Sequence, residues 1–222
     1  MRIRKRLPAL LAAALPAAVT GTGLAAQQAS PAHTHVAHVA TAFGGTPEGN
    51  GLAATASAEA GTALLHANFS AGDLSDLGAM QRHGGHVAHL LDPTGAGSGP
   101  GLGMGVVPAV EGVLRHIGLA AETEGASESL RTHAGHVTTI GNGILEVARR
   151  AAEVGRRLEA APSIRRASPL VAELRLLVYH LAEGRDVNGD GQMALDGEAG
   201  VQQMEAHLYL LLEGEALPRE LR

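Results

Sequence analysis

The amino-acid sequence predicts an all-α protein, an antiparallel helical bundle of about six to seven helices. Alanine, leucine and valine dominate the chain, and apolar residues recur at three- and four-residue intervals, the period of an amphipathic helix. No segment shows the strict apolar–polar alternation of a half-buried strand. The connections between the long periodic segments are short, which favours antiparallel neighbours in a bundle.

Caps and helix breakers set the expected boundaries. Asp73 can cap the third helix, with Asp76 placed near the free amides of its first turn, and Asp92-Pro93 ends it. A glycine-rich loop, residues 94–101, follows and has neither the dinucleotide-binding nor the P-loop spacing. We expect helices at residues 32–43, 52–68, 73–91, 102–122, 127–160, 168–183 and 198–213.

Residues 1–26 have the pattern of a signal peptide. Basic residues within the first six positions precede an apolar run that is interrupted by Pro8 and Pro16, and small residues follow it. No later stretch reaches the roughly 20 apolar residues that a membrane-spanning helix needs. We therefore expect an exported protein, periplasmic or secreted, with one domain at residues 27–222 and no membrane span after signal removal.

Composition excludes several functions. Four of the 17 basic residues lie in the signal and none of the 22 acidic ones does, so the mature chain has a net charge of −9, which disfavours nucleic acid as a partner. The chain has two Phe, two Tyr and no Trp, which leaves few rings for base stacking. The absence of cysteine excludes covalent c-type haem, Fe–S clusters and thiolate zinc sites.

A His-x-x-His-Val pattern occurs three times. Two histidines at i and i+3 lie on one helix face and can chelate together, and imidazole suits copper and zinc. The pattern predicts a transition-metal site, with copper or zinc ahead of nickel, or alternatively a haem site. Its residues are His35, His38 and Val39; His83, His86 and Val87; and His133, His136 and Val137.

Helical projection gives each histidine a direction. His133 falls within the apolar face of its helix and His136 on its border, whereas His83 and His86 flank another apolar face and His89 points away from it. We expect the His83–His86 pair to meet the His133–His136 pair where two helices cross.

The residues around these pairs have simpler expected roles. Gly84 and Gly85 cost roughly 1 kcal/mol each in helix stability against Ala, so they indicate close approach of another helix or a planar ligand. His116 and His207 are interpreted as interfacial hydrogen-bonding residues. Arginines 149, 150, 156 and 157 are interpreted as one solvated face.

Residues 186–198 resemble the EF-hand calcium loop, within a helix–loop–helix at residues 168–213. The expected calcium ligands are the side chains of Asp186, Asn188 and Asp190, the Gln192 carbonyl, and Asp196 or Glu198. The resemblance fails at position twelve, where Gly197 replaces the usual bidentate Glu. The alternative is a turn-rich connector of similar composition.

The His-x-x-His-Val pairs, the glycine-rich break after Asp92-Pro93, and the 186–191 segment with the later Glu205-Ala206-His207 are together similar to a bacterial family of exported, histidine-rich, all-helical proteins. That resemblance implies export and a helical fold and transfers no activity.

The leading functional prediction is an exported metal-binding protein, with calcium at the loop and copper or zinc at the paired histidines, in storage, binding or sensing. One alternative is a non-covalent bis-His haem protein with axial ligands from His83 or His86 and from His133. Another is a structural helical protein whose histidines respond to pH. Glu-x-x-His, His-Glu-x-x-His and Gly-x-Ser-x-Gly motifs are absent, so an enzyme is disfavoured.

Overall fold

The computed structural model describes residues 30–94 and 99–222, and throughout these residues the regular structure is helical. The predicted signal peptide and the centre of the glycine-rich loop lie outside the described residues. None of the described helices combines the length and apolarity needed to cross a membrane. The elements are α1 (Pro31–Ala40), the 3-10 turn η1 (Pro47–Gly49), α2 (Leu52–Phe69), α3 (Leu77–Leu91), α4 (Val106–Glu122), α5 (Glu128–Glu159), α6 (Ile164–Glu183) and α7 (Val201–Gly214).

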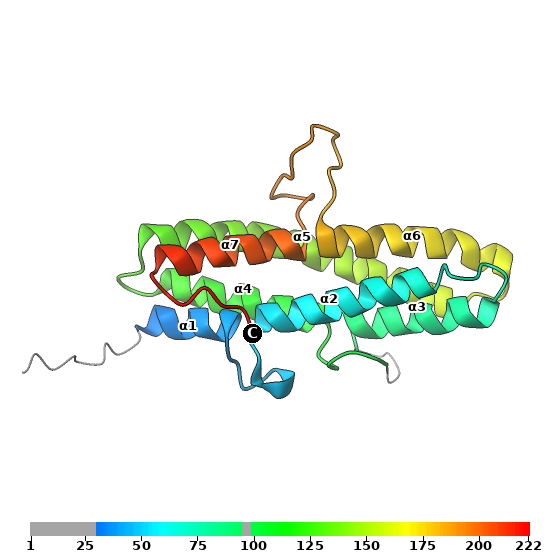
Figure 1. Ribbon diagram of the computed structural model, residues 1–222, viewed down its shortest axis with the longest axis horizontal. Helices are drawn as coiled ribbons and strands as arrows, with labels where there is room; N and C mark the ends of the chain where they lie inside the picture. The colour runs from blue at the N-terminus through cyan, green and yellow to red at the C-terminus, as the bar shows by residue number, and fades with distance from the viewer. Residues whose placement is uncertain (1–29, 95–98) are drawn as a thin grey trace, which may run out of the picture.

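The helices align end to end in four columns that form an antiparallel bundle, which confirms the predicted fold class (Figure 1). The first column holds α1 and α2, the second α3 and α4, the third α5 alone, and the fourth α6 and α7. Helix α5, with 32 residues and a length of about 48 Å, runs along the whole bundle. The first and third columns each pack against both the second and the fourth.

Small residues bring the columns close together. Five alanines of α2 are almost completely buried: Ala53, Ala56, Ala60, Ala63 and Ala67. A Cβ atom added to Gly84 would lie 2.8 Å from Cγ of Leu158, and one added to Gly155 would lie 2.7 Å from the Gly84 carbonyl oxygen. The expected close approach at Gly84 is therefore confirmed, and the approaching element is α5.

The starts of helices α3, α6 and α7 differ from the expected ones. Asp76, not Asp73, caps α3, and its Oδ1 accepts a hydrogen bond from the Ala79 amide at 2.9 Å. Helix α6 begins four residues earlier than expected, at Ile164, and accommodates Pro169 in its second turn. Helix α7 begins only at Val201 because Glu198 belongs to the preceding loop.

Candidate metal centres

Three histidine triads lie between neighbouring helices. In each triad a His-x-x-His pair on one helix faces a single histidine on a second helix from another column. Site I joins α1 to α4, site II joins α3 to α2, and site III joins α5 to α7. Site I consists of His35, His38 and His116; site II of His66, His83 and His86; and site III of His133, His136 and His207.

The Nδ1 atoms of sites I and II lie close together. In site I, Nδ1 of His116 lies 3.0 Å from Nδ1 of His35 and 3.3 Å from Nδ1 of His38. In site II, Nδ1 of His66 lies 2.9 Å from that of His83 and 3.2 Å from that of His86. The two Nδ1–Nδ1 distances from the single histidine to the pair thus repeat within 0.1 Å in two sites formed by different helices.

Site III has the same composition with a wider spacing. Nδ1 of His133 lies 3.4 Å from Nδ1 of His207, and a ligand nitrogen of His136 lies within 4.8 Å of both partners. Nδ1 of His136 is buried and has no hydrogen-bond partner among the described residues. A buried ring nitrogen without a partner is costly unless an ion or water binds it.

Hydrogen bonds between the rings cannot account for all the close contacts between imidazole nitrogens in a triad. A neutral imidazole nitrogen carries either one hydrogen or one lone pair, so Nδ1 of His116 can make one well-directed bond to His35 or His38, not to both. By contrast, three nitrogens bound at about 2.0–2.1 Å to one tetrahedral ion lie about 3.3 Å apart. The observed spacings of 2.9–3.4 Å are close to that value.

Burial and repulsion within a triad lower the pKa of several triad histidines. Burial lowers the pKa of His66 and His207 below the usual 6.5, and the neighbouring histidines of the same triad lower it further. Burial followed by repulsion from triad neighbours also lowers the pKa of His116 and His133. Since metal binding requires an unprotonated ring nitrogen, these shifts favour ligation at neutral pH.

The position of each histidine follows from its place in the helical sequence. The second histidine of each pair is followed directly by a buried valine, for example Val39 and Val87. The single histidines precede buried residues in the same way, as His116 precedes Ile117 and His207 precedes Leu208. Each ring therefore lies partly buried at the border between core and solvent, where two columns meet.

Both phenylalanines of the chain pack against a triad. The Phe43 ring centroid lies 5.3 Å from that of His38 and 5.0 Å from that of His116, in site I. The Phe69 centroid lies 5.6 Å from that of His66 and 5.4 Å from that of His83, in site II. Site III consequently has no phenylalanine beside it.

The expected meeting of the two histidine pairs is wrong. His83 and His86 face His66, whereas His133 and His136 face His207. Helices α3 and α5 do pack together, but they approach at Leu158 near the C-terminal end of α5, far along the helix from its pair. The pairs therefore lie on different seams of the bundle.

The single histidines also need correction. His116 and His207 were interpreted as interfacial hydrogen-bonding residues, and His66 received no ligand role, yet each completes a triad. The signal that would have identified them is their place in the helix, since each lies three residues after one buried residue and one before another. That is the position of the first histidine in every pair, since His35, His83 and His133 follow the buried Ala32, Met80 and Leu130 by three residues.

The remaining histidines lie outside the triads. His33 Nε2 lies 3.0 Å from the Glu215 carboxylate. His89 does not point into solvent as expected: it is partly buried, and its Nδ1 is buried with no partner among the described residues. A Cβ atom added to Gly99 would lie 2.6 Å from its ring, so the loop after α3 covers it. His180 is partly buried, and burial lowers its pKa.

The loop between α6 and α7 projects from the bundle (Figure 1). Asp186 accepts hydrogen bonds from the Gly189 amide at 2.6 Å and the Gly191 amide at 2.8 Å, and these bonds lower its pKa. Asn188 and Asp190 accept from amides two residues later, each at 2.8 Å. The Asp186, Asn188 and Asp190 side chains thus accept hydrogen bonds from amides of the loop itself, although Asn188 and Asp190, like Asp196, are exposed.

Glu198 closes this loop. Its Oε1 accepts hydrogen bonds from the Val187 and Asn188 amides at 3.0 and 3.1 Å, and its Oε2 accepts from the Ala194 amide at 2.9 Å. Glu198 is 5% exposed. Between the two carboxylates left open by the sequence, this arrangement favours Glu198 over Asp196 as the one directed towards the loop interior.

No protein-family model, curated protein or solved structure matches the chain.

Proposed function

We propose that this protein binds transition-metal ions at three separate mononuclear centres, sites I, II and III, in storage, binding or sensing outside the cytoplasm. The observation that carries the proposal is the convergence of three imidazole nitrogens in each triad. Two of the triads have nitrogen spacings within a few tenths of an ångström of each other, although different helices build them.

The donor set narrows the choice of metal. Each centre offers three neutral nitrogens and no sulfur or carboxylate within the triad, which suits copper or zinc better than calcium, magnesium or manganese. Three protein ligands leave the fourth position of a tetrahedral ion for water or an exchanging ligand. Haem is less well supported, because a bis-His haem separates its two axial nitrogens with the iron and the porphyrin plane, whereas these nitrogens converge directly.

Repetition favours a binding role over catalysis. A catalytic metal site needs an acid, a base or a substrate pocket near the metal. A protein that only binds metal instead gains one bound ion with each further copy of the same ligand set. The three triads contain histidine only. They lie at different places along the bundle, so that each ion is bound separately.

Metal titration of the tag-free mature protein tests this proposal. We expect three equivalents of Zn²⁺ or Cu²⁺ by calorimetry and by metal analysis after gel filtration. His66→Asn, His116→Asn and His207→Asn should each remove one equivalent, and the triple variant should remove all three. His89→Asn is the matched control, since it changes a histidine on α3 outside the triads, and it should still bind three.

Equal metal uptake by the mature protein and the triple variant would contradict the three centres. A folded triple variant, checked by circular dichroism, separates loss of ligands from loss of structure.

We also propose calcium at the loop of residues 186–198, with ligands from Asp186, Asn188, Asp190, the Gln192 carbonyl and Glu198. The inward position of the Glu198 carboxylate, which replaces the missing ligand at position twelve, supports this second function. Calcium should change backbone amide NMR shifts of this loop in the mature protein and leave them unchanged in Asp186→Asn. Calcium titration without any shift at millimolar concentration would exclude it.

A further inference from the structure

The three metal centres occupy three of four comparable places in the bundle. The seam between the first and second columns carries sites I and II, one at each end, and the seam between the third and fourth columns carries site III where α5 meets α7. The fourth place is the end where α5 meets α6. It contains no histidine triad among the described residues.

Other residues hold the corresponding positions at this fourth place. Arg157 lies three residues after buried Val154 and directly before buried Leu158, which is the position of the single histidine in each triad. On α6, Leu170 and Glu173 precede the buried Val171 and Leu174, as the paired histidines precede buried residues elsewhere. Arg157 therefore holds the helix position that a metal-ligating histidine holds in each proposed centre.

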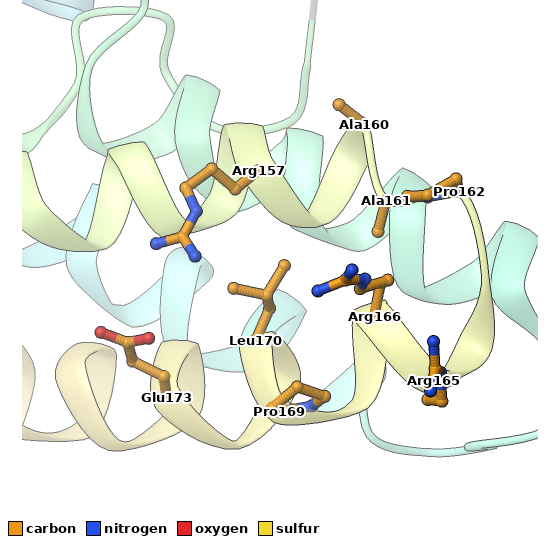
Figure 2. A pocket seen from close by; sticks show the side chains of 9 residues that line it. All are labelled: Arg157, Ala160, Ala161, Pro162, Arg165, Arg166, Pro169, Leu170 and Glu173. Carbon is orange, nitrogen blue, oxygen red and sulfur yellow. The ribbon is translucent and has the colours of Figure 1, made fainter.

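A pocket of about 510 Å³ opens at this place, between the end of α5 and the start of α6. Figure 2 shows Arg157 reaching down from α5 and Arg166 extending from α6 on the two sides of Leu170. Arg165 also lines the pocket, next to the turn at Pro162. Its size is within the range of small-molecule sites, about 300–1,000 Å³.

The positive charge of the pocket is not neutralised by neighbouring carboxylates. Arg157, Arg165 and Arg166 form no ion pair with any residue in the described part of the chain. Glu173, the one acidic side chain of the lining, forms an ion pair with Arg150 at 2.9 Å. Three unpaired arginines therefore surround one cavity on a chain whose net charge is −5.

Arg149, Arg150 and Arg157 of α5 are exposed and Arg156 is partly buried, in agreement with the expected solvated face. Arg149 pairs with Glu111, and Arg156 lies near Asp92 and Glu153, so these side chains have carboxylate partners. Arg157 differs from them because it faces the pocket.

We propose that this pocket binds a phosphate monoester of a small organic molecule. Guanidinium groups match phosphate oxygens bidentately, and arginines from two helices can hold one phosphate from two sides. Pro162, Pro169 and Leu170 provide an apolar part of the lining for the carbon portion of the ester. Free phosphate shares the chemistry of the charged group but would leave that apolar surface uncovered.

Calorimetric titration of the metal-free mature protein tests the proposal with inorganic phosphate, phenyl phosphate and sulfate at constant ionic strength. We expect phenyl phosphate to bind more tightly than inorganic phosphate, and both more tightly than sulfate. Arg157→Gln and Arg166→Gln should each weaken phenyl phosphate binding by about tenfold or more. Arg149→Gln, which changes an arginine of α5 outside the pocket, is the matched control and should bind as the unaltered protein does.

Equal binding of phenyl phosphate, phosphate and sulfate would overturn the proposal, because it would indicate only non-specific attraction of anions to the arginines. The same conclusion would follow if Arg149→Gln lost as much affinity as Arg157→Gln, or if phenyl phosphate did not bind. All three variants should retain three equivalents of zinc, which shows that they fold and separates this site from the metal centres.

Discussion

At the scale of single residues, the aromatic neighbours distinguish the three centres. Phe69 follows His66 by three residues on α2 and packs on the rings of His66 and His83. The residue at the same spacing after His207 is Leu210, whose side chain is 44% exposed. A ring against the ligands restricts the approach of water or a chelator, so ions in sites I and II should exchange more slowly than the ion in site III.

Phe69→Ala tests this difference. Removing the ring should increase the rate at which site II loses zinc to a chelator by several-fold, since the open coordination position becomes easier to reach. The rate is measured by stopped-flow absorbance with a metal indicator. Leu210→Ala at the corresponding position of site III is the control and should leave its release rate unchanged. Equal rates in Phe69→Ala and the unaltered protein would show that the ring does not shield the ion.

The sequence alone predicts two of the three histidines of each candidate site at this scale. Each His-x-x-His-Val pair is visible because both ligands lie on one helix, and all three pairs do enter triads. The third ligand comes from a helix 17 to 81 residues away along the chain, as the separations of His66 from His83 and of His35 from His116 show. Which columns become neighbours depends on the packing of the whole bundle, and that information is not contained in local spacing.

At the scale of helices, the contact between α3 and α5 depends on two glycines. Gly84 and Gly155 let the backbones approach so closely that an added methyl group would meet Leu158 or the Gly84 carbonyl oxygen. Gly84→Ala and Gly155→Ala should each lower the free energy of unfolding by about 1–3 kcal/mol, because overpacking forces the helices apart. Urea denaturation measures the loss. Gly155→Ala should be the more harmful, since its contact is with rigid backbone.

Gly61→Ala is the control for this contact. Gly61 is exposed on α2, and a Cβ atom there would have no neighbour within 4 Å. The substitution should therefore stabilise the protein, by up to about 1 kcal/mol, through the higher helix propensity of alanine. A loss of stability in Gly61→Ala equal to that in Gly84→Ala would show that the loss does not depend on the lack of interhelical space at Gly84.

Helix boundaries were predictable where a cap or breaker acts locally. Asp92-Pro93 follows α3 as predicted, and α5 lies within one residue of its predicted bounds at each end, with Ser127 as its N-cap. The start of α7 was missed because Glu198 bonds back to amides 4 to 11 residues earlier and so delays the helix. Helix α6 begins at Ile164, four residues before its expected start, and contains Pro169 in its second turn.

At the scale of the whole molecule, metal binding should stabilise the bundle, because each centre links two columns. An ion that binds only the folded state, at a free concentration 100 times its dissociation constant, raises the free energy of unfolding by about 2.7 kcal/mol. Zinc should therefore raise Tm in differential scanning calorimetry, with a smaller increase in each single Asn variant than in the unaltered protein. His116→Asn should remove the metal-dependent tether of α1, a helix of ten residues that is too short to be stable alone.

The histidine triads also predict how the stability of the metal-free bundle depends on pH. Burial lowers the pKa of six triad histidines in the folded protein: His66, His83, His86, His116, His133 and His207. Below about pH 6.5 the unfolded chain binds more protons than the folded one at these positions, so stability decreases as pH falls. The decrease ends below the folded pKa values, where both states are protonated.

Carboxylates such as Asp186 and Glu198, whose amide hydrogen bonds lower their pKa below the usual acidic values, act only in a more acidic range. The change between pH 7.5 and 5.5 therefore belongs mainly to histidine. Urea midpoints at these two pH values should differ clearly for the unaltered protein and less for the variant with His66→Asn, His116→Asn and His207→Asn. An equal change in both proteins would place the titrating groups outside the triads.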